Sequence, residues 1–503
     1  MKKYNLIYLI IAALLGATSC SDDFLTNLPE TVVSAEDFYK TESDYAQAII
    51  GVYQPVRSLY NTGLAGYGAW TMGEMRSDNT TFSYNVSNRG YADREFVDLF
   101  IDDSNGGSTS NKYNNDYIII GRANQILSQI DDAAISEASK NNYKGQALFL
   151  RAFAHFDLVQ YFGDVPLMTE PATSYEETLK NRTPKAEVLD QIIADATLAA
   201  ELLPGRDAQA PGYVANGAAY TLLGNAYLVL EDWANAEAAL RNVTGYSLLS
   251  DYAAIFDPNN KNNAEMIFEV QFTDDPTAGA ASNWAYNFLP ILTNPGVIPG
   301  FPSGSTNNYA GWNTPTPDLI AEYEEGDLRL DASIGFYTGE GYVDRPYVKK
   351  YVHGAQIAPN TNNDWPVYRY SEVLLMLAEA LNEQGETGDA LTYLNMVHAH
   401  PRTGLSELSI SSQSELREAI MKERQIELAF ENKRWLDLVR WGIAVEVMNA
   451  QGAKIKANPQ AYYYPEGVAP INEAYNVTSD RLLFPIPERE LRLNPDMVQN
   501  PGY

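Results

Sequence analysis

The chain has 503 residues, of which 45% are hydrophobic and 20% are charged, and this composition is typical of a folded globular protein. Its formal net charge is −30, from 65 acidic and 35 basic residues. Such a surface repels phosphate backbones, which excludes nucleic acid as a partner. It also disfavours acidic polysaccharides, unless a local basic patch overrides the global field.

The N-terminus has the layout of a secretory signal. Lys2 and Lys3 precede an apolar run at residues 6–15 that is too short to span a bilayer, and small residues follow at 16–19. Cys20, the only cysteine, stands directly after them. The simpler interpretation is an ordinary signal peptide with a chance cysteine.

The position of Cys20 resembles a bacterial lipoprotein processing site, although Ala17 stands where Leu is usual. The resemblance implies that residues 1–19 are removed and that Cys20 is lipidated, so that acyl chains anchor the protein to a membrane. The acidic stretch Ser21-Asp22-Asp23 resembles the signal that sends lipoproteins of Bacteroidetes to the cell surface.

Helical periodicity begins after this segment. Ser34 or Asp37 is the expected cap of a first helix with apolar positions from 38 to 56. Residues 60–107 are rich in Gly, Asn and aromatics and break the pattern, which resumes at 112–130.

Residues 143–161 predict a strong helix that ends at Gly163, and Thr183-Pro184 predicts the start of the next helix. These two helices are interpreted as a hairpin with an insertion at its turn.

Two further hairpins carry the tetratricopeptide spacing of small and apolar residues, at 219–243 and at 370–397. Each hairpin buries only one face and needs neighbours. Because the copies are far apart, the sequence predicts a mainly α-helical, tetratricopeptide-like scaffold with large loop-rich insertions at about 60–107 and 245–366.

The second insertion includes an alternating stretch, EMIFEVQF at 265–272, that predicts a strand. Seven prolines between 276 and 317 exclude a regular helix there. Residues 327–350 are expected to form a short hairpin around Gly339.

The C-terminal part has two predicted helices, at 414–431 and 434–441, followed by a mostly irregular remainder. Arg424, Glu427 and Glu431 are spaced for ion pairs on one helix face. They also contain two carboxylates, the group that glycosidases use in pairs, although the helical spacing favours a structural role.

Five stretches together resemble the SusD/RagB family of Bacteroidetes outer-membrane lipoproteins. They are CSDDFL at 20–25, RAFAHFDLVQYFGDVPL at 151–167, YRYSEVLLMLAEALNE at 368–383, ERQIELAFENKRWLDLVRWG at 423–442 and LFPIPERELRLNPDMVQNPGY at 483–503. The resemblance covers residues 20–503 and implies one SusD-like domain with four helical hairpins.

The resemblance also implies a function. Family members capture oligosaccharide at the cell surface, without enzymatic activity, as the lid of a SusC-like TonB-dependent outer-membrane transporter, and some bind peptides instead. We therefore expect a glycan-binding lipoprotein of the outer membrane. The alternatives are a peptide-binding protein of the same fold and, less favoured, a surface glycoside hydrolase.

Sugar binding needs aromatic faces for stacking and planar polar groups for hydroxyls. Two stretches supply this mixture, and they are expected to meet on one face with Trp70, Trp284 and Trp312 as the platform; alternatively, each ring packs under its own loop. The candidate ligand-binding residues are Trp70, Asn79, Tyr84, Arg89, Trp284, Tyr286, Tyr309 and Trp312.

No common catalytic or nucleotide-binding motif is present, so neither an enzyme nor a cofactor is expected. His398 and His400 form an HxH motif, but a solvated helix end is the favoured interpretation over a metal site. The stretch at 257–265 is vaguely similar to a calcium loop, and Lys261 at an expected ligand position counts against it.

Overall fold

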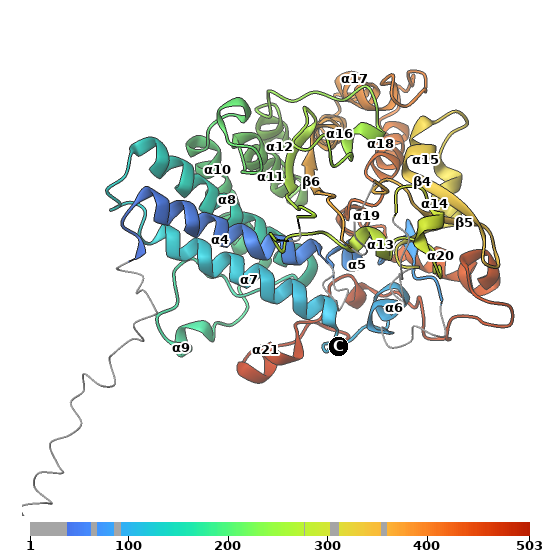
Figure 1. The fold of residues 1–503 in the computed structure, drawn as a ribbon, viewed down its shortest axis with the longest axis horizontal. Helices are drawn as coiled ribbons and strands as arrows, with labels where there is room; N and C mark the ends of the chain where they lie inside the picture. Colours follow the sequence, from blue (N-terminus) through green and yellow to red (C-terminus); the bar gives the residue numbers. More distant parts are fainter. Residues whose placement is uncertain (1–37, 62–67, 85–91, 276, 302–310, 354–359) are drawn as a thin grey trace, which may run out of the picture.

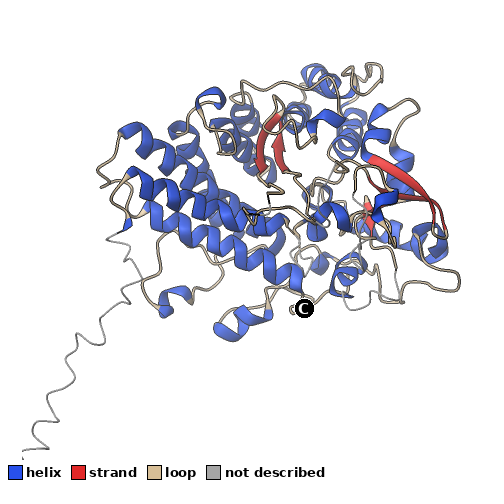
Figure 2. Cartoon of the chain, viewed as in Figure 1, coloured by secondary structure: helices blue, strands red, loops and turns tan. Residues whose placement is uncertain are grey.

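The computed structural model describes residues 38–61, 68–84, 92–275, 277–301, 311–353 and 360–503. Long helices fill one half of the molecule, and short helices, loops and a β-hairpin fill the other half (Figure 1). Figure 2 shows how few strands accompany the helices. The prediction of a mainly helical scaffold with loop-rich insertions is confirmed, and these halves are called the scaffold and the loop-rich half below.

The scaffold begins with four long helices that lie side by side (Figure 1). Thr41 caps the first of them through a reciprocal capping box with Asp44. The predicted caps Ser34 and Asp37 lie outside the described residues. Gly163 ends the third helix with a φ of 72°, as predicted. The four helices are α4 (Glu42–Tyr60), α7 (Gly107–Leu127), α8 (Glu137–Phe162) and α10 (Lys185–Leu202).

Both predicted tetratricopeptide-like hairpins are present. The first is α11 (Asn216–Val229) with α12 (Trp233–Leu240), and the second is α16 (Tyr370–Glu383) with α17 (Thr387–His398). A Cβ atom on Gly224 would lie 2.5 Å from Cγ and Cδ2 of Leu240, so this glycine allows the close approach of α11 and α12.

Three two-stranded antiparallel sheets join segments of the insertions. The pair β2 (Met266–Val270) and β6 (Trp365–Arg369) is buried on both faces, and β4 (Ile334–Gly339) pairs with β5 (Tyr342–Val348) as the predicted hairpin. The short strands β1 (Thr80–Thr81) and β3 (Thr314–Pro315) tie the first insertion to the second.

One longer helix was not predicted: α20 lies in the C-terminal part that the sequence indicated to be irregular. The helices not described above are mostly short, and α18 and α20 are the longest of them. They are α5 (Trp70–Gly73), α6 (Ala92–Leu99), α9 (Tyr175–Thr178), α13 (Trp284–Asn287), α14 (Pro317–Glu322), α15 (Leu328–Ser333), α18 (Gln413–Glu427), α19 (Arg434–Arg440), α20 (Ala444–Ala457) and α21 (Glu488–Leu493), with 3-10 turns at Arg206–Ala208, Ala253–Ile255, Pro295–Val297, Pro459–Tyr462 and Ser479–Arg481.

A single large hydrophobic core runs from Tyr45 in α4 to Ile486 near the C-terminus and includes residues of both halves. A smaller core lies among α16, α17 and α18. Within the part of the chain that the structure describes, no helix combines the length and the apolar character needed to cross a membrane.

Candidate functional site

The two aromatic stretches predicted to bind sugar do meet, but they meet inside the protein. The rings of Trp70 and Trp312 stack with their centroids 6.1 Å apart, and Trp284 packs edge-on against Tyr351 at 4.5 Å. All three tryptophan side chains are 0% exposed. The prediction that they form an exposed stacking platform is therefore wrong for this structure.

The physical reason is that the loop-rich half contains little regular structure. Its loops cannot cover the core with continuous apolar helix faces, so large rings such as Trp70, Trp284 and Trp312 supply the buried apolar area. The alternative interpretation, in which each ring packs beneath its own loop, describes these three residues.

Two other candidates have structural contacts in the interior. The Asn79 amide donates to Glu74 Oε1 at 2.8 Å and accepts from Gln425 at 2.9 Å. Tyr286 packs edge-on against Phe301, with ring centroids 4.6 Å apart, and is buried. Neither side chain presents a surface to a sugar.

The carboxylate of Glu74 holds this region to the scaffold. It accepts hydrogen bonds from the backbone N–H groups of Phe430 and Asn432, both of which have left-handed φ values. Burial raises the pKa of Glu74 to about 7 in spite of these donors. Glu74 therefore fixes the loop around Asn79 against the turn that follows α18.

The remaining candidates are Cys20, Arg89 and Tyr309, which lie outside the described residues, and Tyr84, which is partly exposed. The ring of Tyr84 stacks on that of Tyr464 at 5.7 Å. Tyr84 is thus the one predicted aromatic residue, of those that the structure describes, that has an accessible face.

Tyr84 belongs to a cluster of aromatic side chains around Arg345 on β5. The Arg345 guanidinium lies 4.7 Å from the ring centroid of Tyr342 and 4.6 Å from that of Tyr463. It also donates to Ser83 Oγ at 3.4 Å, next to Tyr84 in the chain. We call Tyr84, Tyr342, Arg345, Tyr463 and Tyr464 the Arg345 cluster.

One feature of the sequence points to this cluster. Three consecutive tyrosines, Tyr462 to Tyr464, stand in a stretch without helical periodicity. Tyr463 has a left-handed φ of 72°, and its hydroxyl donates to the Pro315 carbonyl at 2.6 Å. Unusual backbone conformations of this kind are frequent at ligand sites.

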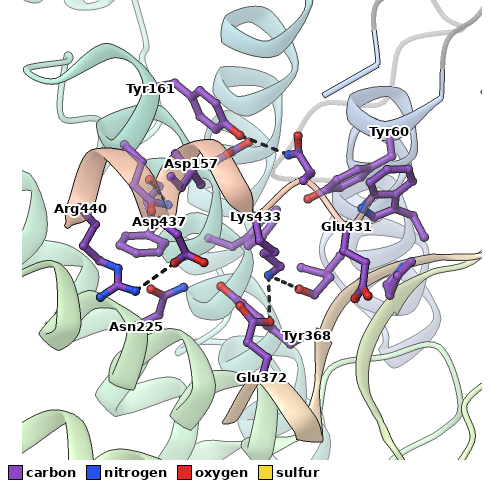
Figure 3. A pocket seen from close by; sticks show the side chains of 18 of the residues that line it. Tyr60, Asp157, Tyr161, Asn225, Tyr368, Glu372, Glu431, Lys433, Asp437 and Arg440 are labelled. Carbon is purple, nitrogen blue, oxygen red and sulfur yellow. Dashed lines mark hydrogen bonds and ion pairs between the residues drawn. The ribbon is translucent and has the colours of Figure 1, made fainter. Parts of the chain in front are cut away.

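A deeper pocket lies where the scaffold meets the loop-rich half (Figure 3). Its cavity volume is about 60 Å³, whereas pockets that hold organic ligands measure roughly 300–1,000 Å³. The space suits a few water molecules and not a sugar ring. The labelled residues of Figure 3 that line it are Tyr60, Asp157, Tyr161, Asn225, Tyr368, Glu372, Glu431, Lys433, Asp437 and Arg440.

The charged side chains of this pocket pair with one another. Lys433 Nζ lies 2.9 Å from Glu372 Oε2 and donates to the Val367 carbonyl at 2.7 Å, and Arg440 contacts Asp437 at 2.9 Å (Figure 3). Mutual pairing leaves these groups poorly placed for catalysis or ligand capture. The pocket is a structural joint.

A buried charge network continues from this joint. Arg369 contacts Glu427, Glu431 and Glu265 at 2.6, 2.7 and 3.0 Å. Burial alone would raise the pKa of Glu427 and Glu431. The positive charges of Arg369 and the other cations around it outweigh this effect and lower both pKa values. We call the whole set the seam network; it comprises Glu265, Asp327, Arg329, Lys350, Arg369, Arg402, Glu423, Glu427 and Glu431.

The predicted structural role of Arg424, Glu427 and Glu431 is confirmed, although their partners differ from those expected. Glu427 and Glu431 pair within the seam network, whereas Arg424 pairs with Asp437 at 2.9 Å. A glycosidase acid needs a raised pKa, and carboxylates held ionised by arginine lack that property.

Within the described ranges, no group of three or more potential ligands is arranged to hold a metal ion. His398 is buried, and its Nδ1 lies 2.9 Å from Glu423 Oε2, so the interpretation of a solvated helix end is wrong for this residue. In the calcium-like stretch, the Lys261 ammonium contacts Asp364 at 2.7 Å and Asn362 at 3.0 Å. The Lys261 ammonium, a cation of the protein itself, therefore supplies the positive charge beside Asp364.

Comparison with known proteins defines the class to which this fold belongs. Residues 320–503 match the model of the SusD family, and residues 23–228 match a model described as "Starch-binding associating with outer membrane". SusD-like protein P2 of Formosa agariphila is 30% identical over the whole of both chains.

Solved structures of similar proteins have the same fold. A "Laminarin binding SusD-like protein" superposes with a TM-score of 0.74 at 26% identity, covering 92% of this chain and all of the other. Surface glycan-binding protein A from Bacteroides uniformis has a TM-score of 0.74 at 24% identity and covers 92% and 99% of the two chains.

The fold and these similarities define a class of surface glycan-binding proteins that associate with the outer membrane. The chain belongs to the SusD family, as the resemblance of its motifs implied. Members of this family bind glycans without catalysing a reaction on them, so this protein is a binding protein and not an enzyme.

Proposed function

We propose that this protein is a surface lipoprotein that captures an oligosaccharide and delivers it to a SusC-like TonB-dependent transporter in the outer membrane. Family membership and the lipoprotein-like position of Cys20 support this proposal. Some relatives are named for binding glycans, among them the laminarin-binding protein. Capture beside a transporter raises the local concentration of a weakly bound ligand.

We place the capture site at the Arg345 cluster. Tyr84, Tyr342 and Tyr463 are partly exposed, in contrast to the buried tryptophans, whereas Tyr464 is buried. Ring faces of this kind stack on the C–H-rich faces of sugars, while the phenol and guanidinium groups offer hydrogen bonds to hydroxyls. The observation that carries this placement is the pair of partly exposed tyrosine rings, Tyr342 and Tyr463, that both contact the Arg345 guanidinium.

Affinity electrophoresis tests the proposal. The chain lacking residues 1–20 is run through gels that contain laminarin, starch, dextran or another neutral polysaccharide. We expect at least one polymer to slow migration, and the Tyr342→Ala and Tyr463→Ala variants to lose most of that retardation, because each removes a stacking face worth about 1 kcal/mol.

Tyr393→Ala is the matched control. Tyr393 is a partly buried tyrosine of the scaffold that also contacts an arginine, Arg241. Its removal should leave retardation unchanged. Loss of retardation in all three variants would contradict the placement, and retention of oligopeptides with indifference to every glycan would favour the peptide-binding alternative.

Membrane fractionation tests the anchor and the partner. We expect the full chain to co-purify from detergent-extracted outer membranes with a barrel protein of the TonB-dependent class. The Cys20→Ala variant should appear in the soluble fraction, since no acyl chain can then hold it. A Cys20→Ala variant that stays with the membrane would contradict lipid anchoring.

A further inference from the structure

Within the described part of the chain, no carboxylate pairs with Arg345, and in this it differs from the buried arginines of the seam network. Among the residues that the structure describes, its polar contact is the hydroxyl of Ser83 at 3.4 Å, which is a weak hydrogen bond. Its other contacts are the two ring faces of Tyr342 and Tyr463. Arg369, by comparison, contacts three carboxylates.

The acidic residues of the same hairpin are engaged elsewhere. Asp344 accepts from the Thr338 hydroxyl at 3.0 Å, and Glu340 accepts from the backbone and the hydroxyl of Thr293 at 2.8 and 2.9 Å. The described carboxylates of this hairpin therefore do not neutralise Arg345, although the chain has 65 acidic residues. A partly desolvated cation in this state is held at an energetic cost, and burial lowers the pKa of Arg345.

The surroundings hold this guanidinium in place. Tyr463 is anchored through its hydroxyl to the Pro315 carbonyl at 2.6 Å, and Asp344, next to Arg345, has a left-handed φ of 46°. The two tyrosine ring centroids lie 4.7 and 4.6 Å from the guanidinium carbon, and the hydrogen bond to Ser83 uses one of the guanidinium nitrogens, so the others can donate to a ligand. A fixed guanidinium edge matches the two oxygens of a carboxylate or a sulfate.

We propose that Arg345 binds an anionic group on the captured glycan, so that the protein selects acidic saccharides that carry uronate carboxylates or sulfate esters. This inference rests on the proposed function and names the class of its ligand. Tyr342 and Tyr463 hold the guanidinium, and the partly exposed Tyr84, which stacks on the buried Tyr464, extends the aromatic surface beside it. The local cation thus opposes the net charge of −30, which by itself disfavours acidic polymers.

The test uses matched pairs of polymers and isothermal titration calorimetry on the chain lacking residues 1–20. Uronate polymers such as alginate and polygalacturonate are compared with the same polymers after reduction of their carboxylates to alcohols. Sulfated polymers such as carrageenan and fucoidan are compared with their desulfated forms. Laminarin and dextran serve as neutral ligands.

We expect one acidic polymer to bind at least about tenfold more tightly than its neutralised form, because hydrogen bonds to a charged group are strong. The uronate and sulfate arms identify which anion is bound. Arg345→Gln should remove this preference, and Arg345→Lys, which keeps the charge without the fork, should restore part of it.

Arg241→Gln is the matched control, because Arg241 also lies over a tyrosine ring but has a carboxylate partner, Glu237, at 2.7 Å. It should leave the preference intact. Thermal unfolding of each variant establishes that it folds. If Arg345→Gln does not fold, the preference for the acidic polymer is measured on Arg345→Lys instead.

The outcomes separate this inference from the proposed function. Equal binding of acidic and neutralised forms, or a preference that survives Arg345→Gln, would overturn the role of Arg345 while neutral glycan capture stands. Failure of every acidic and neutral glycan to bind would overturn both.

Discussion

The two halves of the molecule are stabilised in different ways. The scaffold depends on close helix packing, as at Gly224 in α11, where a side chain would collide with Leu240. The loop-rich half depends on buried tryptophans and on residues with left-handed backbone conformations, such as Asn313 and Tyr463. Because irregular backbone supports more varied surfaces, this half is the suitable place for a ligand site.

The seam network joins these halves, and its loss should have the largest effect. Arg369→Leu would remove the counter-charge that the buried Glu427 and Glu431 share. We expect the free energy of unfolding to fall by about 3–5 kcal/mol, as measured by denaturant titration.

Arg417→Leu is the control for this variant. Arg417 makes a two-pronged contact with Glu383 at 2.6 Å, but it is substantially exposed to solvent. Its loss should cost less than about 1 kcal/mol. Similar losses for the two variants would show that the seam network does not hold the halves together.

Gly224→Ala tests the packing of the scaffold itself. Its Cβ atom would displace the buried Leu240 side chain, and we expect a loss of about 1–2 kcal/mol in the free energy of unfolding. Gly121→Ala in α7 meets open space and should instead stabilise the protein by about 0.5–1 kcal/mol. Stabilisation by both changes would contradict close packing at Gly224.

His155 in α8 makes the scaffold sensitive to acid. Its Nδ1 lies 3.0 Å from the Arg151 carbonyl and its Nε2 accepts from the Met168 N–H, so the ring is held neutral; burial lowers its pKa to about 3. The unfolded chain binds a proton below about pH 6.5, while the folded protein does not. Stability should therefore fall as the pH drops from about 6.5 towards 3, by up to about 1.4 kcal/mol per unit.

His155→Gln should flatten this dependence in denaturant titrations at pH 4 to 7. His400→Gln should change it less, because His400 is partly exposed. An unchanged slope in His155→Gln would show that other groups control the acid response.

The sequence predicted the scaffold well because its signals are local. Small residues at fixed spacing identified the two tetratricopeptide-like hairpins, and Gly163 identified the end of α8. The helix α20 was missed, and it contains Gly452, which weakens a helical pattern in the sequence. In the fold that glycine lies against Tyr475, where a Cβ atom would be 2.2 Å from the tyrosine Cβ. This contact joins distant parts of the chain and leaves no local pattern.

The candidate site was harder to predict for the same reason. The composition of the loops indicated aromatic side chains, but only tertiary packing decides which rings face solvent. Trp70 and Trp312 pack inward, whereas Tyr463, placed by its hydrogen bond to Pro315, keeps an accessible face beside Arg345. The sequence separation of Tyr84, Arg345 and Tyr463 hides their proximity.

Hydrogen–deuterium exchange with and without bound oligosaccharide shows whether the loop-rich half captures the ligand at the Arg345 cluster. The oligosaccharide is derived from the polymer that binds most tightly. The account predicts slower exchange in β5 (Tyr342–Val348) and around Tyr463, with no change in α11 and α12. Slower exchange confined to the helical hairpins, with β5 unaffected, would contradict it.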